Sequence, residues 1–364
     1  MLYSFSRLVY RILTVVGVLD GRAAYKRRIQ LTGRSTYIVS LPKEWVETWR
    51  LGRGSEVTLE VMPDGSLKIA PSASERPARR DRRVIDLRGK ELDLSFVIKS
   101  VIASYLAGYD EVLLLFGDGS VDAVSKIRSI VESNILGFNV LEEGPGYIVF
   151  VSVVDHRSME FSRALSRMAR IAAEMIRDVA RGLENGDRGL LDLVAERDQL
   201  VDKLYLYMAR QMTMASSGRL PLKDLGVYSP AEIVHLFLAV KSIERVADHA
   251  TILSVRVSAS LGAGMSVENG LSSLVMEAAE GFSKSVEALI KADAGLAASI
   301  APVLSEYRSR LESMTAQEFL RGGGSLLRYL VIDSMRRITG YSLDIAEAAL
   351  DISAVREKAK SEGP

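Results

Sequence analysis

The feature that most constrains the fold is a basic, strand-forming segment at residues 26–71 that is short for an independent domain. It reads as a basic strand, a turn, a short apolar strand, a Leu-Pro-Lys step, a short helix, a glycine-rich turn and a hairpin at Asp64-Gly65. A unit of fewer than about 50 residues buries too little apolar surface against itself. The segment therefore predicts a β unit that needs a partner, and its basic start suggests a dimer that grips an acidic polymer.

The charge distribution separates the front of the chain from the rest. The formal net charge is +1 over 364 residues, but residues 22–90 hold 16 Lys and Arg against 8 Asp and Glu. Residues 91–364 hold 29 Lys and Arg against 37 Asp and Glu. A basic front and an acidic rear predict a polyanion-binding head on a separate body.

Composition narrows the class of protein. A length of 364 residues with 48% hydrophobic and 26% charged residues is typical of a folded protein of two or three domains. The chain has no cysteine, which excludes disulfides, thiolate zinc sites and cysteine nucleophiles. This composition fits a reducing interior, and we expect a cytoplasmic protein.

Within the first 21 residues, the stretch from Leu8 to Leu19 is mostly apolar, but it includes Arg11 and is too short to span a bilayer. For residues 1–21 we expect a helix that docks on the protein, with no integral membrane insertion. Membrane association of this segment is the alternative.

Two segments separate the basic unit, which we place at 24–71, from the acidic rear. Residues 72–83 are small and polar with several arginines, which predicts an extended linker. These arginines could also contact phosphates, but a solvated tether is the simpler interpretation. Residues 84–154 show the order β-α-β-α-β-β, which predicts a small α/β sandwich without a recognisable site.

Residues 156–360 are helical throughout. Apolar residues recur in steps of three and four, which is typical of the buried face of a bundle helix. Ser229, Pro230 and Glu232 form the pattern of a capping box at one helix start. Asp187-Arg188-Gly189-Leu190 recurs as Asp293-Ala294-Gly295-Leu296. We therefore expect an all-α six-helix bundle of two three-helix repeats, 156–262 and 265–360.

Two helices of the first repeat carry carboxylates four residues apart. Asp198 and Asp202 lie on one, and Glu244 and Asp248 lie on the next. A spacing of four places each pair on one helix face. Such a group can bind a hard cation, or it can form a solvated face of ion pairs with nearby cations. The candidates for the second interpretation are Arg197, Lys203, Lys241 and Arg245. His249, which follows Asp248, is more typical of a packing residue than of a ligand.

Residues 26–71 resemble the AbrB/MazE-type (SpoVT-AbrB) swapped-hairpin DNA-binding domain. The resemblance rests on Lys26-Arg27-Arg28, Thr32-Gly33-Arg34, Ile38-Val39-Ser40-Leu41-Pro42-Lys43, Leu51-Gly52-Arg53-Gly54 and the Asp64-Gly65 hairpin. It implies a dimeric swapped-hairpin β-barrel in which residues 24–71 of two chains interleave. It also implies that double-stranded DNA is contacted by the basic residues Lys26, Arg27, Arg28, Arg34 and Lys43.

The helix segment Ser242-Ile243-Glu244-Arg245-Val246-Ala247-Asp248-His249-Ala250 resembles the signature of the PhoU family of phosphate-uptake regulators. Together with the tandem repeat, the resemblance covers residues 157–358. It implies a six-helix bundle whose acidic motif can bind an iron- or zinc-type metal. By this resemblance the ligands are Glu244 and Asp248, with Asp198 and Asp202 on the neighbouring helix.

The second repeat departs from the acidic motif. Arg336 stands where Glu244 does in the first repeat, and Gly340 stands where Asp248 does. By the register of Asp293, Leu304 and Arg308 replace Asp198 and Asp202. We therefore expect one metal site rather than two.

Three classes of function are consistent with these features. The first is a DNA-binding transcriptional regulator of phosphate homeostasis whose helical body senses a metal, phosphate status or a partner. The second is an adaptor of a phosphate transporter or of a sensor kinase, in which the basic unit only dimerises. The third is an enzyme, which we do not expect, because the chain has 3 histidines and no recognisable nucleophile motif.

Overall fold

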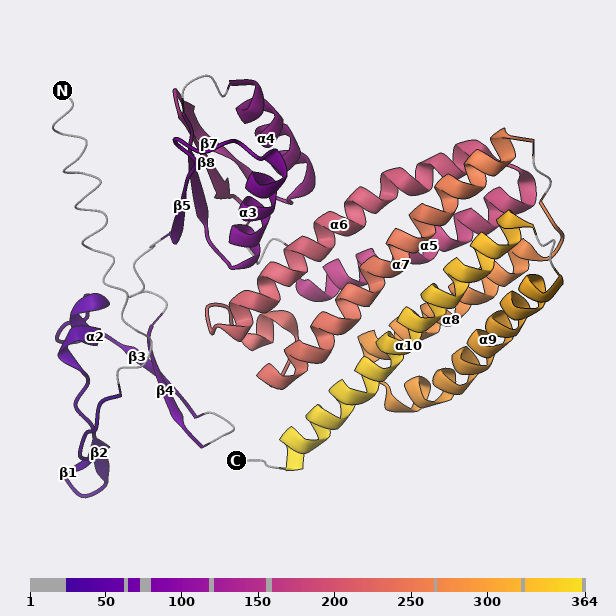
Figure 1. Cartoon of the computed structure of the whole chain (residues 1–364). Coiled ribbons are helices and arrows are strands. Elements are labelled where there is room, and N and C mark those ends of the chain that lie inside the picture. The colour runs from indigo at the N-terminus through magenta and orange to yellow at the C-terminus, as the bar shows by residue number, and fades with distance from the viewer. Residues whose placement is uncertain are drawn as a thin grey trace. The chain divides into compact units, whose positions relative to one another are not determined.

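The computed structural model describes residues 24–61, 65–72, 80–117, 121–154, 159–264, 267–321 and 325–361. The chain divides into two compact units, Met1–Arg79 and Arg80–Pro364. The expected multidomain organisation is therefore confirmed, with two hairpins at the front, a small sheet and a long helical part (Figure 1). The helix expected within residues 1–21 lies outside the described residues.

The described residues of the first unit form two antiparallel hairpins and a short helix. Strands β1 (Gln30–Thr32) and β2 (Thr36–Ile38) form one hairpin, and β3 (Val57–Val61) and β4 (Leu67–Pro71) form the other. Helix α2 (Lys43–Thr48) lies between them in the chain. The strands and the helix occur in the order that the sequence predicts.

Most of the apolar side chains of these hairpins are exposed to solvent. Ile29 is 71% exposed, Tyr37 is 73% exposed and Val61 is 78% exposed. None of the residues of α2 is buried. Burial of such apolar surface is the dominant favourable contribution to folding, and residues 24–61 and 65–72, the described part of this unit, bury little of it. The dimeric swapped barrel, which needs two chains, remains a prediction.

The second unit begins with a four-stranded sheet and two helices. In chain order these are β5 (Arg82–Asp86), α3 (Leu94–Leu106), β6 (Glu111–Leu115), α4 (Val121–Asn134), β7 (Phe138–Gly144) and β8 (Tyr147–Ser152). The strand order is β5-β6-β8-β7, with β5 parallel to β6 and the other pairs antiparallel. The β-α-β-α-β-β order is confirmed, and both helices pack on the sheet through one apolar core.

One boundary differs from the expected one. The linker was expected at 72–83, but Arg82 and Arg83 belong to β5. Arg82 also forms an ion pair of 2.7 Å with Glu111 on the adjacent strand. Strand pairing and this ion pair hold two of the predicted linker arginines in the sheet.

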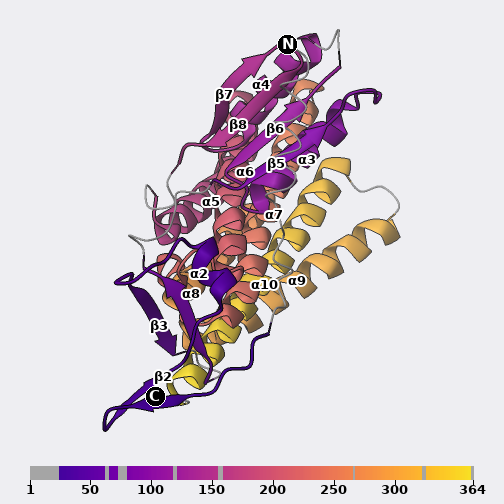
Figure 2. The same ribbon diagram turned by 90° about the vertical axis from the view of Figure 1, so that its left-hand side faces the viewer.

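Six long helices form the rest of the second unit. They are α5 (Phe161–Asn185), α6 (Arg188–Ser216), α7 (Pro230–Gly262), α8 (Leu271–Lys291), α9 (Ala294–Arg321) and α10 (Leu326–Ser361). A short 3₁₀ helix, Leu222–Leu225, precedes α7. Helices α7 and α10, the last of each repeat, lie side by side (Figures 1 and 2). The helical part agrees with the predicted bundle of two three-helix repeats.

The repeat is visible in its helix caps. The backbone N–H of Leu190 donates to Asp187 Oδ1 over 3.1 Å at the start of α6. The backbone N–H of Leu296 donates to Asp293 Oδ1 over 2.9 Å at the start of α9. Side-chain caps of this kind satisfy backbone donors that the helix itself leaves unpaired. The same sequence motif thus begins the second helix of both repeats.

The predicted capping box is also present at the start of α7. Ser229 Oγ accepts from Ala231 N, and Glu232 Oε1 accepts from Ser229 N. Glu232 is fully buried and its other oxygen pairs with Arg356 of α10 over 2.8 Å. The cap therefore also ties the first repeat to the second.

A buried arginine joins the α/β part to the helical part. Arg210 of α6 donates to the backbone oxygens of Tyr105 and Tyr109 over 2.6 and 2.8 Å. It also pairs with Asp110 over 3.0 Å. Because charged groups rarely occur buried without such partners, these contacts fix α6 against the end of α3.

None of the helices in the described ranges is long and apolar enough to cross a membrane.

Candidate functional site

Three carboxylates of the first repeat meet on the packed faces of α6 and α7. Asp198 and Asp202 of α6 and Asp248 of α7 each place one carboxylate oxygen within 4.8 Å of the others. The spacing of four residues on α6 aligns its two acids on one face, and α7 packs against α6. All three residues are partly buried.

Keeping Asp198 and Asp202 charged at this partly buried position costs free energy. Asp198 Oδ1 is buried and has no hydrogen-bond partner. Burial, followed by the charges of Asp202 and Asp248, raises the pKa of Asp198 to about 6. Burial also raises the pKa of Asp202, with the Asp248 charge as the second cause. A bound cation would relieve both the burial cost and the repulsion.

Glu244, the fourth predicted ligand, does not belong to this group of three. Its Oε1 accepts from Lys241 Nζ over 2.5 Å, one turn earlier on α7. Its Oε2 is buried and has no hydrogen-bond partner. Burial raises the pKa of Glu244, and the bond from Lys241 opposes that shift. Glu244 is thus an ion-paired neighbour of the three aspartates.

The four cations that could have neutralised these acids are mostly engaged elsewhere. Arg197 pairs with Asp178 of α5, and Arg245 lies over the Tyr341 ring at 5.6 Å. Lys241 pairs with Glu244. Among the described contacts, none joins these residues or Lys203 to the three aspartates in an ion pair. The geometry therefore favours a cation site over a face of ion pairs at the three aspartates.

The second repeat replaces the carboxylates by an apolar cluster. Leu304, which stands where Asp198 does, is buried together with Ile300 and Ala346, and Leu343 packs against them. Arg336, which stands where Glu244 does, pairs with Asp333 over 2.9 Å. The four equivalent positions of the second repeat, Leu304, Arg308, Arg336 and Gly340, thus carry no carboxylate.

Two residues near the aspartates have roles that the sequence leaves open. The His249 ring packs on Tyr341 of α10 with centroids 5.7 Å apart, and burial lowers the pKa of His249. Sequence reasoning missed Thr251, whose buried hydroxyl lies beside Asp198. The signal in the sequence that could have identified Thr251 is its position about one turn after Asp248 on the same helix.

The predicted DNA-contacting residues all lie in the first unit and are exposed. Lys26, Arg27 and Arg28 precede β1, and Arg34 lies in the turn between β1 and β2. The Arg27 guanidinium lies 5.5 Å from the centroid of the Tyr25 ring. Lys43 begins α2 and makes an exposed ion pair of 3.6 Å with Glu47. Four of the five cations thus lie on or next to the β1–β2 hairpin, and Lys43 lies on the following helix.

Comparison with known families agrees with this division of the chain. Residues 165–257 match the family described as the PhoU domain. They span most of α5 to α7, the repeat that carries the carboxylates. Residues 30–77 match the family described as antidote-toxin recognition MazE, bacterial antitoxin. The chain therefore joins a MazE-type domain to a PhoU domain.

Two solved structures are similar to the chain. The crystal structure of PhoU from Pseudomonas aeruginosa shares 21% identity, with 56% of this chain and 96% of that one covered at a TM-score of 0.43. The phosphate transport system regulatory protein PhoU from Streptococcus pneumoniae shares 15% identity, with 54% and 94% covered at a TM-score of 0.43. No curated protein matches the chain.

Proposed function

From a chain that joins a MazE-type domain to a PhoU domain, we propose a DNA-binding regulator of phosphate uptake that acts as a homodimer. The first unit contacts double-stranded DNA, and the helical body senses a metal, phosphate status or a partner protein. The proposal depends most on one combination in the first unit. Exposed cations lie beside hairpins whose apolar side chains are largely uncovered by the described residues of a single chain.

The exposed apolar side chains and the exposed cations each have a physical consequence. Pairing of two copies would bury the exposed apolar residues of the hairpins and contribute roughly 25 cal/mol for each Å² buried. It would also place two sets of basic residues on one surface, where arginines contact phosphates and base edges. Dimer formation and DNA binding are thus two results of the same fold.

The test is genome-wide binding of the intact protein in cells grown with and without phosphate. We expect sites at phosphate-transport promoters. The variant R27Q/R28Q/R34Q should lose them, and the exposed-cation variant K126Q on α4 should retain them. If the triple variant keeps its sites, the assigned DNA surface is wrong.

Binding should also weaken steeply with salt. If about 6 to 10 phosphates are contacted, affinity should fall by roughly a thousandfold or more between 50 and 200 mM salt. Fluorescence anisotropy with a labelled duplex measures this slope directly.

The second candidate is an adaptor in which the first unit only dimerises the protein. Its support is the PhoU-domain match over residues 165–257, because the PhoU resemblance implies control of a transporter or a sensor protein. The same triple variant separates the two candidates. An adaptor would keep control of phosphate uptake in cells when its arginines are neutralised, whereas a DNA-binding regulator would lose it.

We further propose that Asp198, Asp202 and Asp248 hold one metal ion, with Glu244 and Thr251 beside it. The donors are carboxylate oxygens, which suit hard cations. Of the iron- and zinc-type ions that the PhoU resemblance implies, iron is the harder one and fits these donors better. When bound, the ion would neutralise the group and link α6 to α7.

Metal binding can be measured by elemental analysis and by thermal unfolding. Purified protein should bind about one iron ion per chain, and the ion should raise the melting temperature. The variant D248N should lose both effects. Equal iron content in D248N and the parent protein would place the metal elsewhere.

A further inference from the structure

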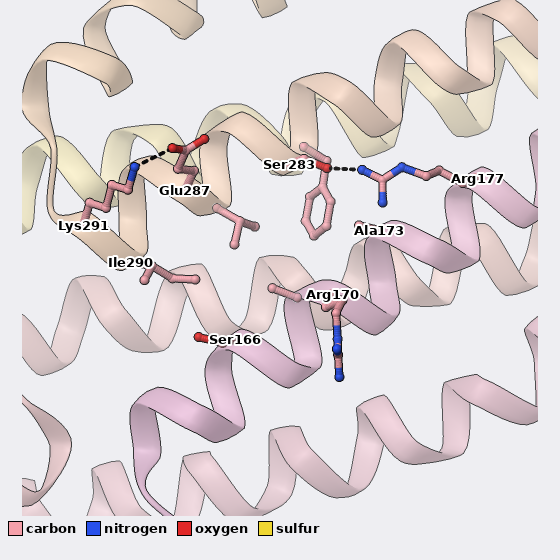
Figure 3. Close-up of a pocket in the computed structure, with 11 residues that line it drawn as sticks. Ser166, Arg170, Ala173, Arg177, Ser283, Glu287, Ile290 and Lys291 are labelled. Carbon is pink, nitrogen blue, oxygen red and sulfur yellow. Dashed lines mark hydrogen bonds and ion pairs between the residues drawn. The ribbon is translucent and has the colours of Figure 1, made fainter.

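A groove between α5 and α8 is cationic at one end and apolar along its floor (Figure 3). It lies on α5 and α8, whereas the three aspartates lie on α6 and α7. Two adjoining hollows form it, of about 410 and 320 Å³. They share Ser166 and Arg170, so one ligand can extend across both.

The first hollow is lined only by cations and hydroxyls. Its five residues are Ser162, Arg163, Ser166, Arg167 and Arg170. All of them belong to the first three turns of α5, and all are exposed. Every side chain in this hollow can donate hydrogen bonds and no carboxylate lines it, which suits an anion with several acceptor oxygens.

Two of the three arginines in this hollow, Arg167 and Arg170, are available to a ligand. Arg163 pairs with Glu160 over 3.4 Å. For Arg167 and Arg170, the described part of the chain offers neither an ion pair nor a hydrogen bond. Arginine binds phosphate in a bidentate manner through its planar fork of donors. Two unpaired arginines one turn apart therefore favour a phosphoryl group.

The second hollow has an apolar floor. It is formed by Ala169 and Ala173 of α5 and by Phe282, Val286 and Ile290 of α8. The two alanines are small, which leaves room between the helices, and Ile290 is 47% exposed at the rim. A volume of about 320 Å³ is near the lower end of the roughly 300–1,000 Å³ found for small-molecule sites.

Apart from Ser166 and Arg170, which it shares with the first hollow, the polar residues that line this second hollow already have partners. Arg177 reaches across the groove to Ser283 over 2.9 Å and pairs with Glu174. Lys291 pairs with Glu287 over 2.6 Å. Figure 3 shows the Arg177–Ser283 contact between α5 and α8 and the Lys291–Glu287 pair on α8, while Arg170 projects from α5 without a partner among the residues drawn. The free positive charge is thus concentrated at the Arg167–Arg170 end.

We propose that this groove binds a small organic phosphate, with its phosphoryl group on Arg167 and Arg170 and its apolar body against Val286 and Ile290. The hydroxyls of Ser162 and Ser166 would donate to the remaining phosphate oxygens. The site depends on neither DNA binding nor the metal, so its test is separate from theirs.

Phenyl phosphate is a suitable probe, because it joins a phosphoryl group to an apolar ring. Isothermal titration of the full chain at constant ionic strength should give one site per chain. Phenyl phosphate should bind more tightly than inorganic phosphate, and phenol should bind more weakly than either. The variant R170Q should weaken binding of both phosphates about tenfold, since a charge-assisted hydrogen bond is lost.

Two further variants separate the halves of the site. I290S should weaken binding of phenyl phosphate and leave inorganic phosphate unchanged. K126Q, which removes an exposed charge on α4, should change neither. All three substituted side chains are exposed, and unchanged melting curves would confirm that the fold persists.

Three results would overturn the proposal. Absence of phenyl phosphate binding would reject the site, as would equal binding by R170Q and the parent protein. Equal affinity for phenyl phosphate and inorganic phosphate would reject the two-part ligand. A hexaglutamate peptide that binds where phenyl phosphate does not would assign the groove to an acidic protein partner instead.

Discussion

At the scale of single residues, Asp198 shows how a site can oppose stability. Its pKa is raised to about 6 by burial and by the neighbouring aspartates. A carboxyl with a raised pKa in the folded state favours its neutral form there, so the metal-free protein should lose stability as pH rises from about 4 to about 6. Above that range the loss should stay constant.

The variant D198N removes this penalty. Without metal it should be more stable than the parent protein at pH 7, and the difference should shrink as pH falls toward 4. Urea unfolding of chelator-treated protein at several pH values measures it. As a control, E196Q neutralises an exposed carboxylate two residues earlier on α6, and it should give no comparable change in stability. If D198N is instead less stable than the parent protein at pH 7, other groups must compensate the charge of Asp198 in the metal-free fold.

At the scale of elements, Arg210 of α6 links the sheet part to the helices, and we expect it to help the two parts unfold together. Its three hydrogen bonds to Tyr105, Tyr109 and Asp110 cross from α6 to the end of α3. R210M should cost roughly 3 kcal/mol, because it leaves buried acceptors unpaired. The expected result is a lower midpoint in urea, with the two parts unfolding in separate steps.

The matched control is R128M, which breaks an exposed ion pair between α4 and β7. Exposed pairs contribute about 0–1 kcal/mol, so R128M should unfold almost as the parent protein does. If the two variants behave alike, Arg210 does not hold the two parts together.

The elements themselves were largely predictable from local chemistry. The caps at Asp187, Asp293 and Ser229 depend on neighbours within four residues, so the sequence reveals them directly. The partners of the cations were predictable only where they are local. Lys241 pairs with Glu244 three residues later on its own helix. Arg197 is adjacent to Asp198 in the sequence, yet it pairs with Asp178 of α5. That choice depends on packing between helices distant in sequence, as does the groove between α5 and α8.

At the scale of the whole molecule, the exposed hairpins predict assembly. Y37K/V61K places two charges on apolar positions that a second copy would cover, and it should weaken the dimer at least about tenfold, since each buried apolar side chain contributes roughly 1.5–3 kcal/mol. Sedimentation velocity across a dilution series measures this. The control is F96K, at an apolar residue of α3 that is 60% exposed. A dimer that survives Y37K/V61K would have its interface elsewhere.

The most direct test of the account is sedimentation equilibrium of the intact protein with and without a labelled DNA duplex. We expect two chains per particle in dilute buffer, and two chains per duplex at low salt, with release of the DNA as salt is raised. A particle of one chain that leaves every duplex unbound would contradict the account.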